Sequence, residues 1–255
     1  MDSMKVVFIH HSCFLVEVDE KVLIFDWFAG DRVNGYRFGG VLPEYMPDTP
    51  VYVFASHKHA DHFDMDVLRL AEKYENIHFV LSKDCKMSPN FLKKHGIDPS
   101  IKEKITYVTV RAKYEIAGGV HVETLRSTDA GVAFYVKTNG ASFFHAGDLN
   151  DWSFEGSDDL TKWKMRREFQ TEIKRLANKD INIAFIPMDP RLGKNQYNAM
   201  DFVLANTNVE CVFPMHMWQD YSGIEHYITK QENPVLATKV VLISCENEEF
   251  DFLEG

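Results

Sequence analysis

The stretch that most constrains the fold of this chain is Ser56–His62, with the sequence S-H-K-H-A-D-H, directly after the apolar run Val51–Ala55. The apolar run is rich in β-branched and aromatic residues and predicts a short buried strand. Imidazole nitrogens and carboxylate oxygens are the ligands that borderline divalent metals such as zinc prefer. A loop of solvated histidines is the alternative, but three histidines and an aspartate at this spacing favour a metal-binding loop.

The spacing within this loop also predicts how its side chains divide. In an extended segment, alternate side chains point to the same side, so His57, His59 and Asp61 can face one way. His62 follows Asp61 immediately and should point elsewhere. We therefore expect two neighbouring metal positions, with His57 and His59 at one and Asp61 and His62 at the other.

Composition limits the classes of partner and location. The 255 residues fit one large domain or two small ones, and a hydrophobic fraction of 45% is ordinary for a globular core. A net charge of -10 argues against a nucleic-acid partner and against docking on an anionic membrane. The N-terminus lacks the pattern of a signal peptide, no apolar run approaches the roughly 20 residues of a membrane span, and the cysteines form no C-x-x-C pair. We expect a cytoplasmic protein with reduced thiols, and a homo-oligomer is compatible with the sequence.

The first quarter of the chain predicts three short strands, and the residues between and after them leave alternatives open. The expected strands are 6–9, 14–18 and 22–26. His10–Cys13 is either a loop near the metal site or an ordinary connection. Asp26 can either orient a ligand histidine or cap the following turn. The Gly-, Pro- and aromatic-rich segment Trp27–Pro50 is long for a loop, which is typical of lids and binding loops.

Further along, strands and helices alternate, and more ligand types appear at strand ends. The expected helices are 63–74, 89–95, 158–178 and 196–205. The expected strands are 77–81, 105–110, 114–116, 120–124, 132–136, 141–145, 181–186, 211–213, 240–243 and 250–252. Asp148 follows one strand beside Gly147, and His216 follows another. We infer two halves that meet near residue 125, with a site at the seam between them.

Together, His57-x-His59-x-Asp61-His62, Gly147-Asp148 and His216 resemble the metallo-β-lactamase superfamily over nearly the whole chain. The most similar branch is the single-domain one that includes ascorbate-6-phosphate lactonase-like hydrolases. The resemblance implies an α+β fold, an αβ/βα four-layer sandwich in which two mixed sheets pack face to face with helices outside. It implies one domain over residues 1–255.

The resemblance also implies a ligand set. His57 and His59 would hold one divalent metal, Asp61, His62 and His216 a second, and Asp148 would bridge both. The family usually supplies a further histidine to the first metal, from the region that reads Arg126–Ala130 here. Asp129 is the obvious substitute, with Ser127 and Thr128 as further candidates. We expect two zinc ions, with manganese or iron as alternatives because a carboxylate ligand is harder than imidazole.

This ligand set predicts a metal-dependent hydrolase. Two metals roughly 3.5–4 Å apart would hold a hydroxide whose pKa falls towards about 7. Such a hydroxide would attack an ester, lactone or phosphoester of a small molecule, with Asp61 or Asp148 as the catalytic proton acceptor. Asp189 and Arg191 are candidate substrate-binding residues, and Arg191 suits an anionic substrate, although a structural salt bridge or a turn is the alternative. A non-catalytic metal-binding protein, or a phosphodiesterase or nuclease of the same fold, are the other hypotheses.

Overall fold

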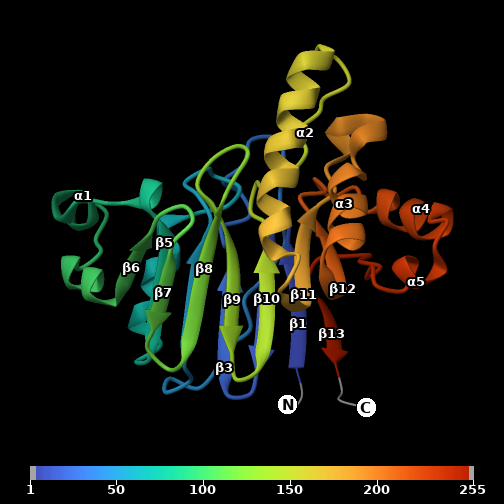
Figure 1. The fold of residues 1–255 in the computed structure, drawn as a ribbon. Helices are drawn as coiled ribbons and strands as arrows, with labels where there is room; N and C mark the ends of the chain where they lie inside the picture. The colour runs from blue at the N-terminus through green and yellow to red at the C-terminus, as the bar shows by residue number, and fades with distance from the viewer. Residues whose placement is uncertain (1–3, 253–255) are drawn as a thin grey trace.

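The computed structural model describes residues 4–252, and in it two mixed β-sheets lie face to face with helices on their outer faces (Figure 1). The predicted α+β sandwich is thus confirmed. The first sheet has seven strands in the order β13-β1-β2-β3-β4-β5-β6. These strands are β1 (Met4–His10), β2 (Cys13–Val18), β3 (Lys21–Phe25), β4 (Val51–Ala55), β5 (Ile77–Ser82), β6 (Ile105–Val108) and β13 (Glu248–Phe252).

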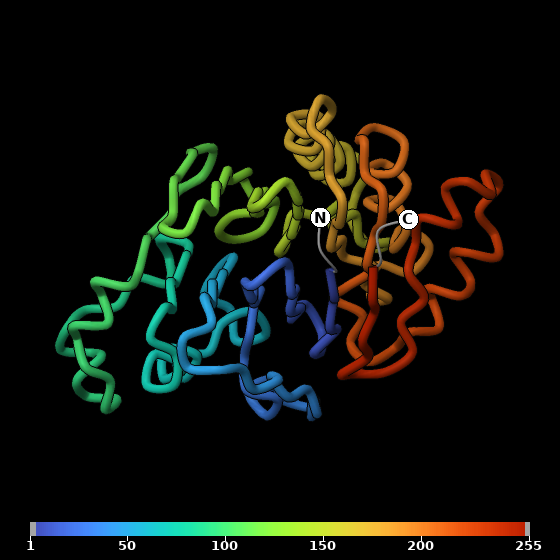
Figure 2. Tube along the Cα trace, turned by 90° about the horizontal axis from the view of Figure 1, so that it is seen from below, coloured from blue at the N-terminus to red at the C-terminus, as the bar shows by residue number. Residues whose placement is uncertain are grey.

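The second sheet has six strands in the order β12-β11-β10-β9-β8-β7. They are β7 (Lys113–Ile116), β8 (Val120–Arg126), β9 (Val132–Thr138), β10 (Ala141–His145), β11 (Asp180–Pro187) and β12 (Asn208–Met215). Seen from below, the blue-to-teal and green-to-orange parts of the chain form the two layers (Figure 2). The chain crosses from one sheet to the other between Val108 and Lys113, earlier than the boundary that we expected near residue 125.

Strand direction brings all the candidate residues to one edge of the sandwich. In the first sheet, β1, β3 and β4 run in the same direction. In the second sheet, β8, β10, β11 and β12 also share one direction. The carboxyl ends of these strands meet at the upper edge in Figure 1, opposite the chain ends. Loops that follow these strands therefore converge on one place.

Aromatic side chains from both sheets fill the space between them. Phe14 and Phe25 of the first sheet lie 4.4 and 5.8 Å from the ring of Phe185 in the second, and Phe54 lies 5.4 Å from Phe134. All five are fully buried. Because burying one such side chain contributes about 1.5–3 kcal/mol, these contacts hold the two sheets, and hence the two halves of the upper edge, in a fixed relation.

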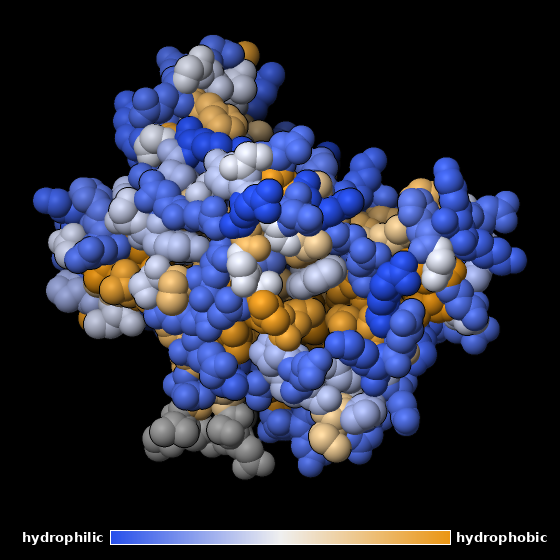
Figure 3. All heavy atoms as spheres, turned by 180° about the vertical axis from the view of Figure 1, so that it is seen from behind, coloured by the Kyte–Doolittle hydropathy of each residue, from blue (hydrophilic) through white to orange (hydrophobic). Residues whose placement is uncertain are grey.

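Helices and one long segment cover the outer faces. The helices are α1 (Pro89–Lys94), α2 (Asp159–Ile173), α3 (Asn198–Asn206), α4 (Ser222–Lys230) and α5 (Pro234–Ala237). In β1, Val6 and Phe8 face the other sheet, whereas Val7 and Ile9 face a second core on the outside of the first sheet. Trp27, Leu42 and Tyr45 of the 27–50 segment pack on this second core. Figure 3 shows that hydrophobic side chains gather near the middle of the back face, among hydrophilic ones.

Three expected elements differ from the structure. The helix expected at 63–74 is a 3₁₀ helix, Met65–Glu72, with Asp64 as its N-cap as predicted. The helix expected at 158–178 is α2, which continues as the 3₁₀ turn Lys174–Leu176.

The strand expected at 240–243 is wrong, because this segment forms only an isolated bridge between Val212 and Val240. The backbone N–H groups of Ser244 and Cys245 both donate to the carboxylate of Glu248, which turns the chain away before more pairing can form. Within residues 4–252, no helix is long and apolar enough to cross a membrane.

Candidate metal centre

The loop after β4 is held by Asp26, which follows the neighbouring parallel strand β3. Ser56 donates to Asp26 twice, from its backbone N–H (2.7 Å) and from its hydroxyl (2.6 Å). His62 Nδ1 lies 2.7 Å from the same carboxylate, which leaves Nε2 to face the site. Of the two alternatives for Asp26, the structure therefore shows the one in which it orients a candidate ligand histidine.

The first candidate cluster contains His57, His59, Asp129 and Asp148, whose ligand atoms lie within 4.8 Å of one another. His57 Nε2 is 2.9 Å from His59 Nδ1 and 3.3 Å from Asp148 Oδ2. Asp129 Oδ2 lies 3.7 Å from His59 Nδ1, in the place where the family resemblance implied a histidine. The side chains of His59 and Asp129 are 47% and 52% exposed, so this cluster is open to solvent on one side.

The second candidate cluster contains His11, Asp61, His62 and His216, again within 4.8 Å of one another. Asp61 Oδ2 is 3.5, 3.6 and 3.8 Å from the Nε2 atoms of His11, His216 and His62. The three histidines are buried and Asp61 is only slightly exposed. This cluster therefore lies deeper in the sandwich than the first one.

Asp148 lies between the two clusters. Its Oδ2 faces His57 at 3.3 Å, and its Oδ1 is 3.1 Å from His62 Nε2 and 3.4 Å from His216 Nε2. A carboxylate with one oxygen towards each group is the geometry required of a bridging ligand.

Unpartnered polar atoms test whether these residues fit a metal. The Nε2 atoms of His11, His62 and His216 and the Oδ1 atom of Asp148 are buried and have no hydrogen-bond partner among residues 4–252. Buried polar groups without a partner destabilise a fold, so their convergence on one point needs a reason. Nitrogen and oxygen donors of this kind suit a divalent cation, so the residues present fit the metal that the family implies.

Two glycines let the loops of the second sheet reach the β4 loop. A Cβ on Gly131 would lie 2.0 Å from the carbonyl oxygen of Ser56, and one on Gly147 would lie 2.6 Å from the Cβ of Ser56. Both glycines have positive φ, +65° and +52°. The close approach that they permit places Asp129 and Asp148 against His57 and His59.

Asp189 holds His216 in place. His216 Nδ1 lies 2.9 Å from Asp189 Oδ2, and Trp218 and Arg191 also donate to this carboxylate. We expected Asp189 to bind substrate, but it is fully buried and its oxygens already accept these bonds. Asp189 therefore positions His216, and a role in binding substrate stays a prediction for it.

Arg191 is committed to a similar structural contact. Its guanidinium pairs with Asp189 and lies 4.5 Å from the centre of the Trp218 ring, although about half of the side chain is exposed. The structure thus shows the salt bridge that was the alternative to substrate binding. A role in binding an anionic substrate stays a prediction for Arg191.

Charges within the site stabilise one another. Burial disfavours the charged form of Asp148, but His62 and His216 outweigh burial and hold the pKa of this carboxyl well below its usual range. Burial likewise favours a neutral His216, yet Asp148, Asp189 and Asp61 raise its pKa to about 9. His62 responds in the same way, since Asp148 and Asp26 raise its pKa well above the usual value despite burial. The carboxylates are therefore ionised and ready to serve as ligands.

His11 is the site residue that sequence reasoning did not place among the ligands. It follows β1, has a φ of +49°, and its ring centre lies 4.3 Å from that of His216. Burial, with His216 next, lowers the pKa of His11 to about 3, so its ring is neutral and able to bind a metal. The direction of β1 could have indicated the position of His11. A strand that runs parallel to β3 and β4 must end at the edge where Asp26 and the β4 loop lie.

Aromatic residues surround the second cluster. The ring of His216 lies 5.5 Å from Trp152 and 5.4 Å from Trp218, and Trp218 lies 4.7 Å from Tyr36. Phe38 lies 5.5 Å from His11. Tyr36 and Phe38 belong to the 27–50 segment, so this segment covers the second cluster and leaves the first one more open.

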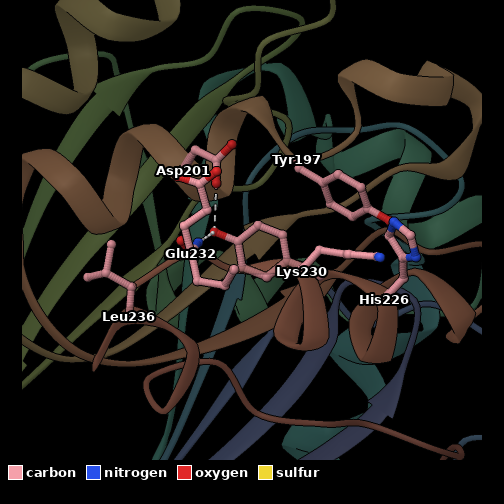
Figure 4. Close-up of a pocket in the computed structure, with 8 residues that line it drawn as sticks. Tyr197, Asp201, His226, Lys230, Glu232 and Leu236 are labelled. Carbon is pink, nitrogen blue, oxygen red and sulfur yellow. Dashed lines mark hydrogen bonds between the residues drawn. The ribbon is translucent and has the colours of Figure 1, made fainter. Parts of the chain in front are cut away.

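The hollow drawn in Figure 4 is a different feature of the molecule. It measures about 470 Å³ and is lined by α3, α4 and the segment that leads to α5. Its Asp201 accepts a hydrogen bond from Tyr227 (2.7 Å), and it contains no member of either cluster. The candidate chemistry is therefore at the upper edge of the sandwich and not in this hollow.

Comparison with known proteins gives one family match and several solved structures of similar fold. A family model described as beta-lactamase superfamily domain matches residues 5–160. No curated protein matches the chain. Igni18, described as a novel metallo hydrolase from the archaeon Ignicoccus hospitalis, is 18% identical, with 99% of this chain and 100% of that chain covered and a TM-score of 0.61.

Two further solved structures share the fold. An isothiocyanate hydrolase from Delia radicum gut bacteria is 10% identical, with 97% of this chain and 99% of that chain covered and a TM-score of 0.53. CmlA, a diiron β-hydroxylase from Streptomyces venezuelae, is 12% identical, with a TM-score of 0.55. The match includes 85% of this chain and 45% of the CmlA chain, which is longer. At these identities, the likeness establishes the architecture and not the reaction.

Proposed function

Since the chain belongs to the beta-lactamase superfamily, we propose that it is a metal-dependent hydrolase of a small ester, lactone or phosphoester. The observation that carries this proposal is the pair of histidine–carboxylate clusters that share Asp148. Two of the solved structures with this fold are described as hydrolases, which supports the same reaction class. The likeness to the ascorbate-6-phosphate lactonase-like branch stays a prediction.

In the proposed site, each cluster holds one divalent metal. His57, His59 and Asp129 would hold the first, the cluster of His11, Asp61, His62 and His216 the second, and Asp148 would contact both. Bound metals supply an acidified water and stabilise negative charge on oxygen. The histidine-rich second cluster favours zinc, whereas Asp129 makes the first cluster harder, so manganese or iron is the alternative there.

The carboxylates would handle the proton. Asp61 is the better placed of the two predicted proton acceptors, because it is partly exposed whereas Asp148 is buried against three histidines. His11 and His216 lower the pKa of Asp61 despite its burial, so it is ionised at neutral pH.

The open side of the first cluster favours catalysis over a purely structural metal site. Structural metal sites are closed by protein ligands, whereas catalytic sites keep a position open for water or substrate. The half-exposed His59 and Asp129 leave such an opening. A non-catalytic metal-binding protein is therefore the second candidate and fits this arrangement less well.

The experiment is metal analysis combined with a substrate panel. Protein loaded with zinc, manganese or iron is assayed on p-nitrophenyl acetate, a γ-lactone, p-nitrophenyl phosphate and bis-p-nitrophenyl phosphate. We expect turnover of at least one substrate, and a loss of roughly 100-fold or more in kcat together with lost metal in His57→Ala and Asp148→Asn. His121→Ala is the control, because His121 is an exposed histidine on β8. Undiminished turnover by metal-free Asp148→Asn protein would refute the proposal.

A further inference from the structure

A small cleft lies beside the first cluster, between α2 and the end of β8. It measures about 270 Å³, and its walls include Arg126, Ser127 and Thr128 on one side and Trp163, Lys164 and Arg167 on the other. In Figure 1, α2 projects beyond the upper edge of the second sheet. The cleft therefore opens near the edge at which the two clusters lie.

Three cationic side chains in the walls of this cleft have no carboxylate partner among the described residues. Among the residues that the structure describes, no carboxylate lies within 4 Å of the side-chain nitrogens of Arg126, Lys164 or Arg167. Glu172 at the base of the cleft is buried and already paired with Arg111 and Arg175. Glu168 is the one further acid of the lining. A cationic cleft in a chain of net charge -10 is a local exception that favours an anionic ligand.

An exposed tryptophan accompanies these cations. Trp163 is 55% exposed, and the guanidinium of Arg167 lies 5.0 Å from the centre of its ring. A ring of this kind offers a flat face against which a planar group can stack.

The cleft is joined to the candidate metal centre by Thr128. The Thr128 hydroxyl donates to the carbonyl of Asn150 (2.7 Å), accepts from the N–H of Asn150 (2.9 Å), and lies 3.2 Å from the carbonyl oxygen of Asp148. The next residue, Asp129, belongs to the first cluster. Thr128, in one wall of the cleft, therefore contacts the backbone of the candidate ligand Asp148 and precedes the candidate ligand Asp129 in the chain.

We propose that this cleft binds the anionic, ring-bearing end of the substrate: a phosphate, carboxylate or sulfonate attached to a planar ring. Arg126, Lys164 and Arg167 would pair with the anion, and Trp163 would stack on the ring. The scissile bond would then lie over the first cluster, which is the more exposed one. This substrate class rests on the proposed hydrolase function, whereas binding of the anion in the cleft does not.

Binding of benzenesulfonate to the metal-loaded protein, measured by calorimetry, tests the cleft. A sulfonate is a poor metal ligand and has no bond that such a site hydrolyses, so the measurement is independent of turnover. We expect Arg126→Ala and Arg167→Ala each to weaken binding about 10-fold, because each removes a charge-assisted hydrogen bond to the sulfonate. Lys94→Ala on α1, far from α2, should bind like the parent chain.

Two comparisons separate the parts of the proposal. Trp163→Leu should weaken benzenesulfonate but leave methanesulfonate, which has no ring, unchanged. With any substrate that the chain hydrolyses, Arg126→Ala should raise KM for an anionic aryl ester and leave KM for a neutral ester unaltered. If the parent chain and the arginine variants bound benzenesulfonate equally well, the proposal that the cleft binds an anion would be refuted. If benzenesulfonate binding depended on the arginines as expected but the protein hydrolysed no ester, only the proposed hydrolase function would be refuted.

Discussion

At the scale of single residues, neighbouring carboxylates raise the pKa values of two histidines of the site. The raised pKa values of His216 and His62 mean that, without metal, both rings hold a proton which the unfolded chain releases near its ordinary value of 6.5. Their stabilising effect is therefore full below pH 6.5 and is lost as pH rises through the folded-state pKa, about 9 for His216.

We accordingly predict that the metal-free protein loses stability between about pH 7.5 and 8.5. In this range the carboxylates are ionised in both states, and the histidines whose pKa is lowered by burial, His10, His11, His78 and His145, are almost entirely neutral in both. Urea unfolding at several pH values measures the slope, and His216→Gln should reduce it. His121→Gln serves as the exposed control. A free energy of unfolding that is flat or rises over this range would contradict the raised pKa values.

A second residue-scale prediction concerns Gly147. An alanine there would combine positive φ with a 2.6 Å approach to the Cβ of Ser56, so the loop carrying Asp148 must shift. We predict that Gly147→Ala lowers stability by about 2–4 kcal/mol and reduces metal content. Thermal unfolding and metal analysis measure the two effects.

Gly119 supplies the matched control for that change. It also has positive φ, +75°, and it is in the turn before β8, but no atom of the described residues lies within 4 Å of the place that a Cβ would take. Gly119→Ala should therefore cost only the backbone strain, about 1 kcal/mol, with metal content unchanged. Equal effects of the two alanines would show that the contact with Ser56 is unimportant.

At the scale of elements, the site is a set of loops that follow strands of common direction. Local spacing was enough to predict the β4 loop, and Gly147-Asp148 and His216 were recognisable because each follows an apolar strand. His11 could not be placed in this way, since its position depends on how β1 pairs with β2 and β2 with β3. The contact between Asp189 and His216 could not be predicted either, because only the folded chain brings His216 Nδ1 within reach of that carboxylate.

The two clusters differ in depth, and this predicts unequal metal binding. Two members of the first cluster are half exposed, whereas the second cluster is almost wholly buried. We expect dialysis against a chelator to remove one equivalent of metal rapidly and the other slowly. Asp129→Ala should eliminate the rapidly lost equivalent, and His11→Ala should speed the loss of the slow one. Simultaneous loss of both equivalents from the unsubstituted protein would refute this difference.

At the scale of the whole molecule, the alternation of strands and helices predicted two halves, and the likeness to a known family predicted that two sheets pack face to face. The point at which the chain changes sheets was less accessible, because β6 and β7 are short and the crossover between them carries no local signal. The 240–243 segment has the composition of a strand, but the turn held by Glu248 prevents it from extending its bridge to β12. Tertiary context decided both cases.

The candidate ligands come from both sheets, so bound metal should stabilise the sandwich as a whole. His57, His59, Asp61 and His62 follow a strand of the first sheet, whereas Asp148 and His216 follow strands of the second. A ligand that binds only the folded state at 100 times its Kd stabilises that state by about 2.7 kcal/mol. At about 2–4 °C per kcal/mol for a chain of this size, we predict that metal raises Tm by about 5–10 °C.

Substitutions on either sheet should have the same effect on this stabilisation. His57→Ala removes a donor of the first sheet and His216→Ala one of the second, and each should reduce the rise in Tm on adding metal, because a site with one donor fewer binds its cation less tightly and stabilises the folded state less. Differential scanning calorimetry with and without metal measures the rise. If metal bound with full stoichiometry and left Tm unchanged, the ions would be held at the surface and not between the sheets, and the placement of both clusters at the seam would be wrong.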